Sequence, residues 1–205
     1  MRAFALATVA LALVACGKQD SPGSADITSG QPKKVDTKVL EKGAQITQEL
    51  APVRAFDHYL EGLHVMRDDP ATQMEAHHYC RAVSEDLTQC AIFDGNAADA
   101  NLIGIEYIIS ESLFRSLDDE EKASWHPHDY EIPSGQLVMP GVPPPAEKAA
   151  RAKKMNSYGK TWHIWDTGHH GHLGQKPPTG EPKLAWSANR DGELPAAMVR
   201  DEAVR

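Results

Sequence analysis

The sequence has few aromatic residues, few cysteines and no long apolar run. Aromatic residues make up 6% of its 205 residues, there are three cysteines, and no apolar run is long enough to cross a bilayer. With 41% hydrophobic and 24% charged residues, the composition is typical of one globular domain. Fourteen prolines and fifteen glycines indicate a sizeable share of loop or linker. We therefore exclude collagen, a coiled coil and a multi-span membrane protein.

Positive charge is also scarce. Lysine and arginine number 21 against 29 acidic residues, which gives a formal net charge of −8. A nucleic-acid partner needs a concentrated positive surface, so none is expected.

The first fifteen residues have the pattern of a secretory signal peptide. Arg2 precedes an apolar run over residues 3–15, which is shorter than the about 20 residues that a membrane span requires. The run ends Leu13-Val14-Ala15-Cys16, which resembles the bacterial lipobox, whose cysteine becomes lipidated. The alternative is a plain signal peptide in which Cys16 is incidental.

The lipobox predicts a membrane anchor of palmitate-type acyl chains on Cys16, because more than one buried chain makes anchoring durable. An Asp after the cysteine would resemble an inner-membrane retention signal, and this chain has Gly17 there. The expected location is therefore the bacterial outer membrane, on the periplasmic face.

The rest of the chain divides by composition. Residues 16–51 are expected to be the lipidated cysteine and a linker, with a flexible tether over 17–37 and a short helix within 38–51. Residues 52–190 are the expected folded domain. Residues 191–205 are an expected frayed tail.

The sequence pattern of the folded part predicts an α+β fold, with a single domain that has a mostly antiparallel sheet and two short helices. One helix is expected over 120–125 behind a capping box at Ser116, and the other from Pro145 to Lys153 and Lys154, with Gly159 as its stop. The expected strands are 56–66, 75–83, 89–93, 102–109, 130–139, 161–166 and 184–187.

Five motifs of the folded part resemble those of the oil-body-associated protein family. They are 75–80 (EAHHYC), 89–90 (QC), 102–110 (LIGIEYIIS), 125–131 (WHPHDYE) and 158–163 (YGKTWH). The resemblance covers about residues 52–190. It implies association with oil-body surfaces in plant members and a domain of unknown function in bacterial ones, and no reaction.

The histidines of these motifs are candidate metal ligands, because imidazole is the commonest ligand of zinc and related metals. Pro127 favours an extended chain, in which His126 and His128 share a face. Glu106 is a lone carboxylate in an apolar strand and needs a partner. The candidate set for a divalent metal, zinc first, is His126, His128, His163, His78 and Glu106.

Structural roles for the same residues stay open. His126 and His128 would then bridge backbone groups, His163 would pack beside Trp165, and Glu106 would pair with an arginine or lysine. The loop histidines His169, His170 and His172 are expected to bind metal weakly. No catalytic residue can be assigned.

Cys80 and Cys90 are the two thiols left once Cys16 is acylated. In an oxidising periplasm they favour a disulfide, and the alternative is a pair of reduced core cysteines. A third reading makes Cys80 a nucleophile with His77 or His78 as its base.

The leading functional hypothesis is a non-catalytic envelope lipoprotein that binds a lipid or a protein partner. An amphipathic patch of Tyr59, Trp162, Trp165 and Trp186 beside the apolar loop 137–145 would meet the lipid. The alternative is a metal-dependent hydrolase in which Glu106 acts as ligand or general base.

Overall fold

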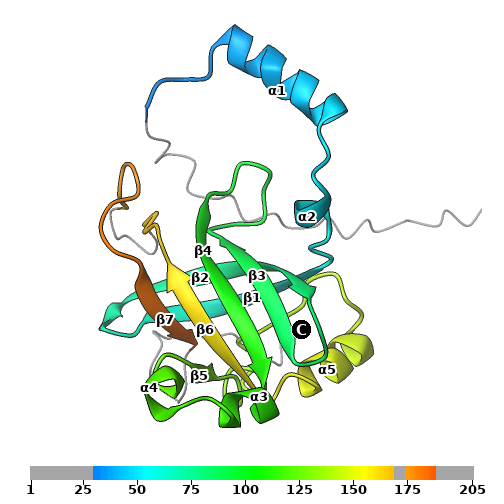
Figure 1. Cartoon of the computed structure of the whole chain (residues 1–205), viewed down its shortest axis with the longest axis vertical. Coiled ribbons are helices and arrows are strands. Elements are labelled where there is room, and N and C mark those ends of the chain that lie inside the picture. Colours follow the sequence, from blue (N-terminus) through cyan, green and yellow to red (C-terminus); the bar gives the residue numbers. More distant parts are fainter. Residues whose placement is uncertain (1–29, 169–173, 188–205) are drawn as a thin grey trace, which may run out of the picture.

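The computed structural model describes residues 30–168 and 174–187 (Figure 1). The expected signal peptide, Cys16, most of the expected tether, the loop histidines and the C-terminal tail lie outside the described residues.

Six antiparallel strands close into a barrel. Hydrogen-bonded neighbours follow the order β4-β3-β2-β1-β7-β6, and β6 pairs back with β4 to close the ring. A short strand, β5 (His126–Pro127), extends the sheet on the free side of β6. The barrel strands are β1 (His58–Met66), β2 (Asp69–Ala82), β3 (Leu87–Phe93), β4 (Leu102–Ser110), β6 (Ser157–His163) and β7 (Lys183–Ser187).

Alternating burial along the strands shows which side chains face the interior, most regularly in β3 and β6. The interior holds two apolar clusters. One contains Leu60, Cys80 and Ile108, and the other contains Met66, Ala76 and Ile103. On β1, β2 and β4 the polar interior residues fall between these two clusters in sequence, so a polar layer separates two apolar ones.

Five helices lie outside the sheet in the described residues: α1 (Val35–Thr47), α2 (Ala51–Arg54), α3 (Glu111–Arg115), α4 (Asp119–Lys122) and α5 (Pro144–Ala152). Helix α1 stands clear of the barrel and buries no residue, whereas α5 lies beside one end of the barrel (Figure 1). Within the described ranges, no helix has the length and apolar character needed to cross a membrane.

The prediction of a mostly antiparallel sheet with few short helices is confirmed, but closure into a barrel was not predicted. The expected strand over 130–139 is wrong. That segment forms turns and keeps one isolated bridge, between Glu61 and Val138. Pro133 lacks a backbone donor and Gly135 has a φ of 73°, which together interrupt a strand.

The expected helix boundaries also need correction. Helix α4 ends at Lys122, and its N-cap is Asp118, whose carboxylate accepts a hydrogen bond from the Glu121 amide at 2.8 Å. Helix α5 ends at Ala152, before the two lysines. Gly159 is therefore no helix stop but lies inside β6, which begins four residues before the expected strand over 161–166.

A disulfide joins the middle of the sheet. Cys80 on β2 and Cys90 on β3 are directly opposed and bonded to each other. A bonded Cys80 offers no thiolate, so the structure does not support its role as a nucleophile.

Removing this disulfide is expected to lower the free energy of unfolding by about 2–3 kcal/mol, the chain-entropy value for a loop of this length. Chemical denaturation of the Cys80→Ala, Cys90→Ala variant measures the loss. A reductant should destabilise the parent chain by a similar amount and leave the variant unchanged. Two reactive thiols in the unfolded, unreduced protein would contradict the pairing.

Candidate metal centre

The polar layer of the barrel consists of titratable side chains that are almost fully buried. Each is at most 3% exposed, and the set is His64, His78, Glu106, His126, His128, Glu131 and His163. Burying such groups is costly unless they are paired with each other or coordinate an ion. Seven of them in one layer therefore need a joint explanation.

The strands bring these side chains together from distant parts of the sequence. His64 comes from β1, His78 from β2 and Glu106 from β4. His126 and His128 come from β5 and the residue after it, and both rings are buried, as the extended chain around Pro127 predicts.

Glu106, His126 and His128 form a set with metal-ligand spacing. Glu106 Oε1 lies 3.6 Å from His126 Nε2 and 3.4 Å from His128 Nε2. These distances exceed the about 2.7–3.2 Å of a good hydrogen bond. They are close to the about 3.3 Å that separates ligands bound 2.0–2.1 Å from a tetrahedral metal. The three groups can therefore hold one ion between them.

His126 supplies an independent reason to expect an ion. Within the described part of the chain, neither of its ring nitrogens has a hydrogen-bond partner, although the residue is fully buried. Buried polar atoms almost always have a partner, so each exception needs an explanation. A metal bound at Nε2 would give one of these two nitrogens a partner.

Gly159 lets the three side chains pack directly against the backbone of β6. It faces His126 across the β5–β6 pairing. A Cβ on Gly159 would overlap Glu106 Oε1 and lie 2.7 Å from His128 Nε2 and 2.8 Å from His126 Cε1. Only a residue without a side chain therefore fits at this point of β6, against which the three side chains pack.

The other oxygen of Glu106 begins a chain of close polar contacts. Glu106 Oε2 lies 2.9 Å from His78 Nε2, which is 3.1 Å from His64 Nε2. His64 Nδ1 is in turn 2.9 Å from His163 Nε2. These are hydrogen-bond distances, so this chain is suited to orienting Glu106. His64, His78 and Glu106 also lie close enough to form a second potential ligand set.

The outer nitrogen of His128 is fixed as well. His128 Nδ1 donates to Ser157 Oγ at 2.8 Å, and Ser157 Oγ donates to the Lys154 carbonyl at 2.6 Å. In the neutral ring this arrangement leaves the Nε2 lone pair directed toward Glu106, which is the form that a metal needs.

The pKa values divide the layer into neutral and charged members. Burial lowers the pKa of His126 to about 3 and that of His64 well below its ordinary value. Burial alone would raise the pKa of Glu106, but contacts with His128 and His78 hold it well below its usual range. Burial alone would lower the pKa of His128, but interactions with Glu106 and Glu131 outweigh it, so this pKa is raised. Burial raises the pKa of Glu131.

We expect the metal-free protein to lose stability as the pH falls below about 6.5. His64 and His126 have depressed pKa values in the fold, so the unfolded chain takes up protons that the fold excludes. Glu106 adds to the loss below about 4.5, where the unfolded carboxyl protonates. His128 acts in the opposite direction, because its raised pKa stabilises the fold most below 6.5.

Melting temperatures between pH 7.5 and 4, measured with a chelator present, test this expectation. The variant His58→Ala is the control, since His58 lies outside the interior layer and pairs with the exposed Asp57, so its pH profile should differ little from that of the parent chain. A melting temperature that stays flat or rises below pH 6.5 would contradict the buried neutral histidines.

The interior has little free volume. A cavity of about 10 Å³ is lined by His64, His78, Glu106, His128 and Glu131, together with neighbouring side chains. This is about the volume that one water molecule requires. This cavity can thus enclose an ion or a water molecule but not an organic substrate.

All five predicted ligands lie in the buried layer, but they divide between the two potential ligand sets, and His163 belongs to neither. His163 contacts His64 instead of packing only beside Trp165. The direct partners of Glu106 are histidines, and Lys154 acts on it only as a nearby charge without an ion pair. His77 lies outside the layer and contacts the Tyr59 hydroxyl at 2.6 Å.

Sequence reasoning missed His64, Glu131 and Gly159. His64 carried a usable signal, because in an alternating strand it faces the same side as Leu60. Glu131 falls within a quoted motif, but the wrong strand assignment hid its position. Trp165 does not join the expected aromatic surface patch. It packs against an apolar cluster and donates a hydrogen bond to the Gln175 carbonyl at 3.1 Å.

A closed antiparallel barrel with a buried layer of histidine and glutamate is the class of protein that this fold and site define. A family model described as "Protein of unknown function (DUF1264)" matches residues 50–205. The chain belongs to this family, whose members include the oil body-associated proteins.

Two plant relatives illustrate the similarity. Oil body-associated protein 1B of Arabidopsis thaliana is 40% identical over 90% of this chain and 75% of its own length. Oil body-associated protein 1A of Zea mays is 41% identical over 80% of this chain and 68% of its own length. No solved structure matches the chain.

Proposed function

We propose that this chain is a non-catalytic, lipid-anchored protein whose barrel holds one divalent metal ion. The ligands are Glu106, His126 and His128. The observation that carries the proposal is the spacing of these three buried side chains, which pack together on a glycine where any Cβ would clash with them.

Charge supports a divalent ion. Glu131 Oε1 lies 3.8 Å from His128 Nε2, so its carboxylate is the nearest candidate for a fourth ligand. Two buried carboxylates would balance the charge of a divalent ion. When no ion is bound, burial raises the pKa of Glu131. Imidazole and carboxylate together suit zinc and its neighbours, and zinc is the first metal to test.

The small interior cavity supports a non-catalytic role. Two histidines and a glutamate resemble the donor set of catalytic zinc sites, which keep a position open for water and substrate. Here the cavity beside Glu106 and His128 is only about 10 Å³ and is lined mostly by buried side chains. A metal-dependent hydrolase would need substrate to reach this position, so we favour a closed centre.

The lipid anchor rests on the sequence alone. Leu13-Val14-Ala15-Cys16 supports acylation of Cys16 and an outer-membrane location facing the periplasm. Incorporation of a labelled fatty acid tests it, with Cys16→Ser as the matched control. Labelling that continues in the variant would contradict the anchor.

The names of the plant relatives describe association with oil bodies. For this chain they support the binding of a lipid or of a partner at a lipid surface. Such binding needs a site outside the closed interior of the barrel.

Metal content tests the central part of the proposal. The full chain, with His169, His170 and His172 replaced by alanine, is purified without chelators or added metal and examined by mass spectrometry. About one ion per chain is expected, and it should be lost in the His126→Ala, His128→Ala variant. His58→Ala should retain it. Metal that survives the double substitution would contradict the assignment.

A further inference from the structure

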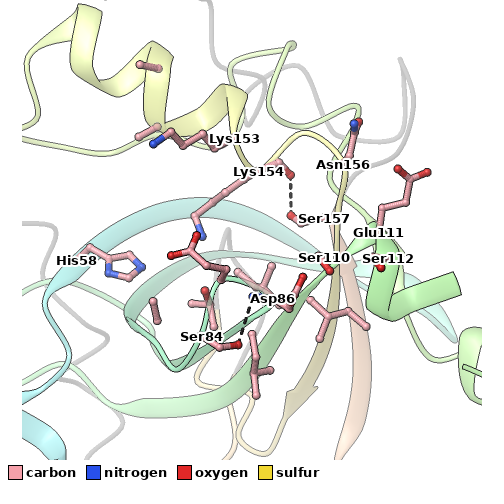
Figure 2. Close-up of a pocket in the computed structure, with 18 of the residues that line it drawn as sticks. His58, Ser84, Asp86, Ser110, Glu111, Ser112, Lys153, Lys154, Asn156 and Ser157 are labelled. Carbon is pink, nitrogen blue, oxygen red and sulfur yellow. Dashed lines mark hydrogen bonds between the residues drawn. The ribbon is translucent and has the colours of Figure 1, made fainter. Parts of the chain in front are cut away.

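A second, much larger cavity lies outside the barrel. Its volume is about 820 Å³, and it is bounded by the turn between β2 and β3, the end of β4, and α5 with the loop that follows it (Figure 2). Pockets for small organic ligands have volumes of about 300–1,000 Å³. This cavity is therefore large enough for a ligand that the interior layer cannot accept.

One wall of the cavity is apolar. Ile108 and Leu87 contribute from the sheet, and Met139 contributes from the segment before α5. Ala146 and Ala149 line it from α5, a helix with no buried residue. The apolar face of α5 thus covers a cavity instead of packing on a core, and an alkyl chain would fill that space.

Lys154 places a positive charge in the same cavity. Its side chain extends from the loop after α5 down toward the barrel, whereas the exposed Lys153 side chain runs along α5 (Figure 2). No hydrogen bond or ion pair joins the Lys154 ammonium to another described residue, although the buried Glu106 carboxylate acts on its charge. Burial also lowers the pKa of Lys154, and the charge of Glu106 offsets this shift only in part.

The cavity also has acidic side chains. Glu85, Asp86 and Glu111 line it, so a head group with two negative charges would meet strong repulsion. A single carboxylate needs only one cation. An apolar wall with one ammonium that forms no direct ion pair therefore fits a molecule with one carboxylate and an alkyl chain.

We propose that this cavity binds an aliphatic monocarboxylate, with the carboxylate on Lys154 and the alkyl chain along α5. The site does not depend on the metal centre, since it shares none of the three proposed ligands. Lys154 also lines the small interior cavity, so the bound carboxylate would lie close to the barrel interior.

Photo-crosslinking tests the proposal on the full chain. The probe is dodecanoate with a diazirine in mid-chain, and mass spectrometry locates the labelled peptides. We expect labelling of α5 and of the β2–β3 turn. Lys154→Met should reduce this labelling at least about tenfold, because a charged hydrogen bond is lost.

Matched variants separate charge from folding. Lys153→Met should label like the parent chain, and Lys154→Arg should keep most of the labelling because it keeps the charge. Labelling confined to other peptides, or equal labelling by the primary amide of the probe, would overturn the proposal. Equal labelling by the corresponding alkyl phosphate would overturn the choice of a monocarboxylate.

Discussion

Replacing Glu106 with glutamine should remove the metal and destabilise the barrel together. Glu106 belongs to both potential ligand sets, so no arrangement of the layer binds an ion equally well without its charge. Changes even to groups behind the ligands weaken metal binding by about 10–100-fold, and a larger loss is expected for a ligand itself. Competition with a chelator of known affinity measures this loss.

The same substitution has a second effect in the metal-free protein. His128 loses the negative partner that raises its pKa, and His78 loses its contact at 2.9 Å. Removing one member of a buried charged pair costs about 3–5 kcal/mol. Chemical denaturation with a chelator present measures the cost. Substitution of Glu61, which lies outside the layer, with glutamine is the control. An E106Q chain as stable as the parent would contradict the charged network.

The Gly159→Ala variant should bind metal poorly although it changes no ligand. The added methyl group would occupy the space between Glu106, His126 and His128, in contact with all three. Overpacking of a core costs about 1–3 kcal/mol, so a loss of stability of that size is expected as well. Metal titration and denaturation measure the two effects.

Gly43 provides the matched control for this prediction. It lies in α1, and a Cβ there would meet nothing within 4 Å. Gly43→Ala should leave metal binding intact and be neutral or slightly stabilising. If Gly159→Ala bound metal as the parent chain does, the ion would not occupy the space above Gly159.

Much of the site could be predicted because it depends on local geometry. The extended dipeptide around Pro127 directs His126 and His128 to one side, and strand alternation isolates Glu106 on an apolar strand. The prediction that Glu106 needs a partner follows from the cost of burying a charge. These arguments need no knowledge of the tertiary fold.

The features that the sequence did not predict depend on contacts between segments far apart in the chain. Closure of the barrel requires β6 to pair with β4, and no sequence pattern states that partner. Closure brings His64 and His163 to 2.9 Å although 99 residues separate them. Gly159 was interpreted as a helix stop because glycine often ends helices, whereas its role depends on three side chains that fold above it.

Anomalous diffraction at the absorption edge of the bound metal tests the central claim most directly. Crystals of the full chain, with His169, His170 and His172 replaced, would be measured just above and just below that edge. We predict one strong peak per chain, within bonding distance of Glu106, His126 and His128 and above Gly159. A peak at any other position, or a bound ion that none of these three side chains contacts, would contradict the account.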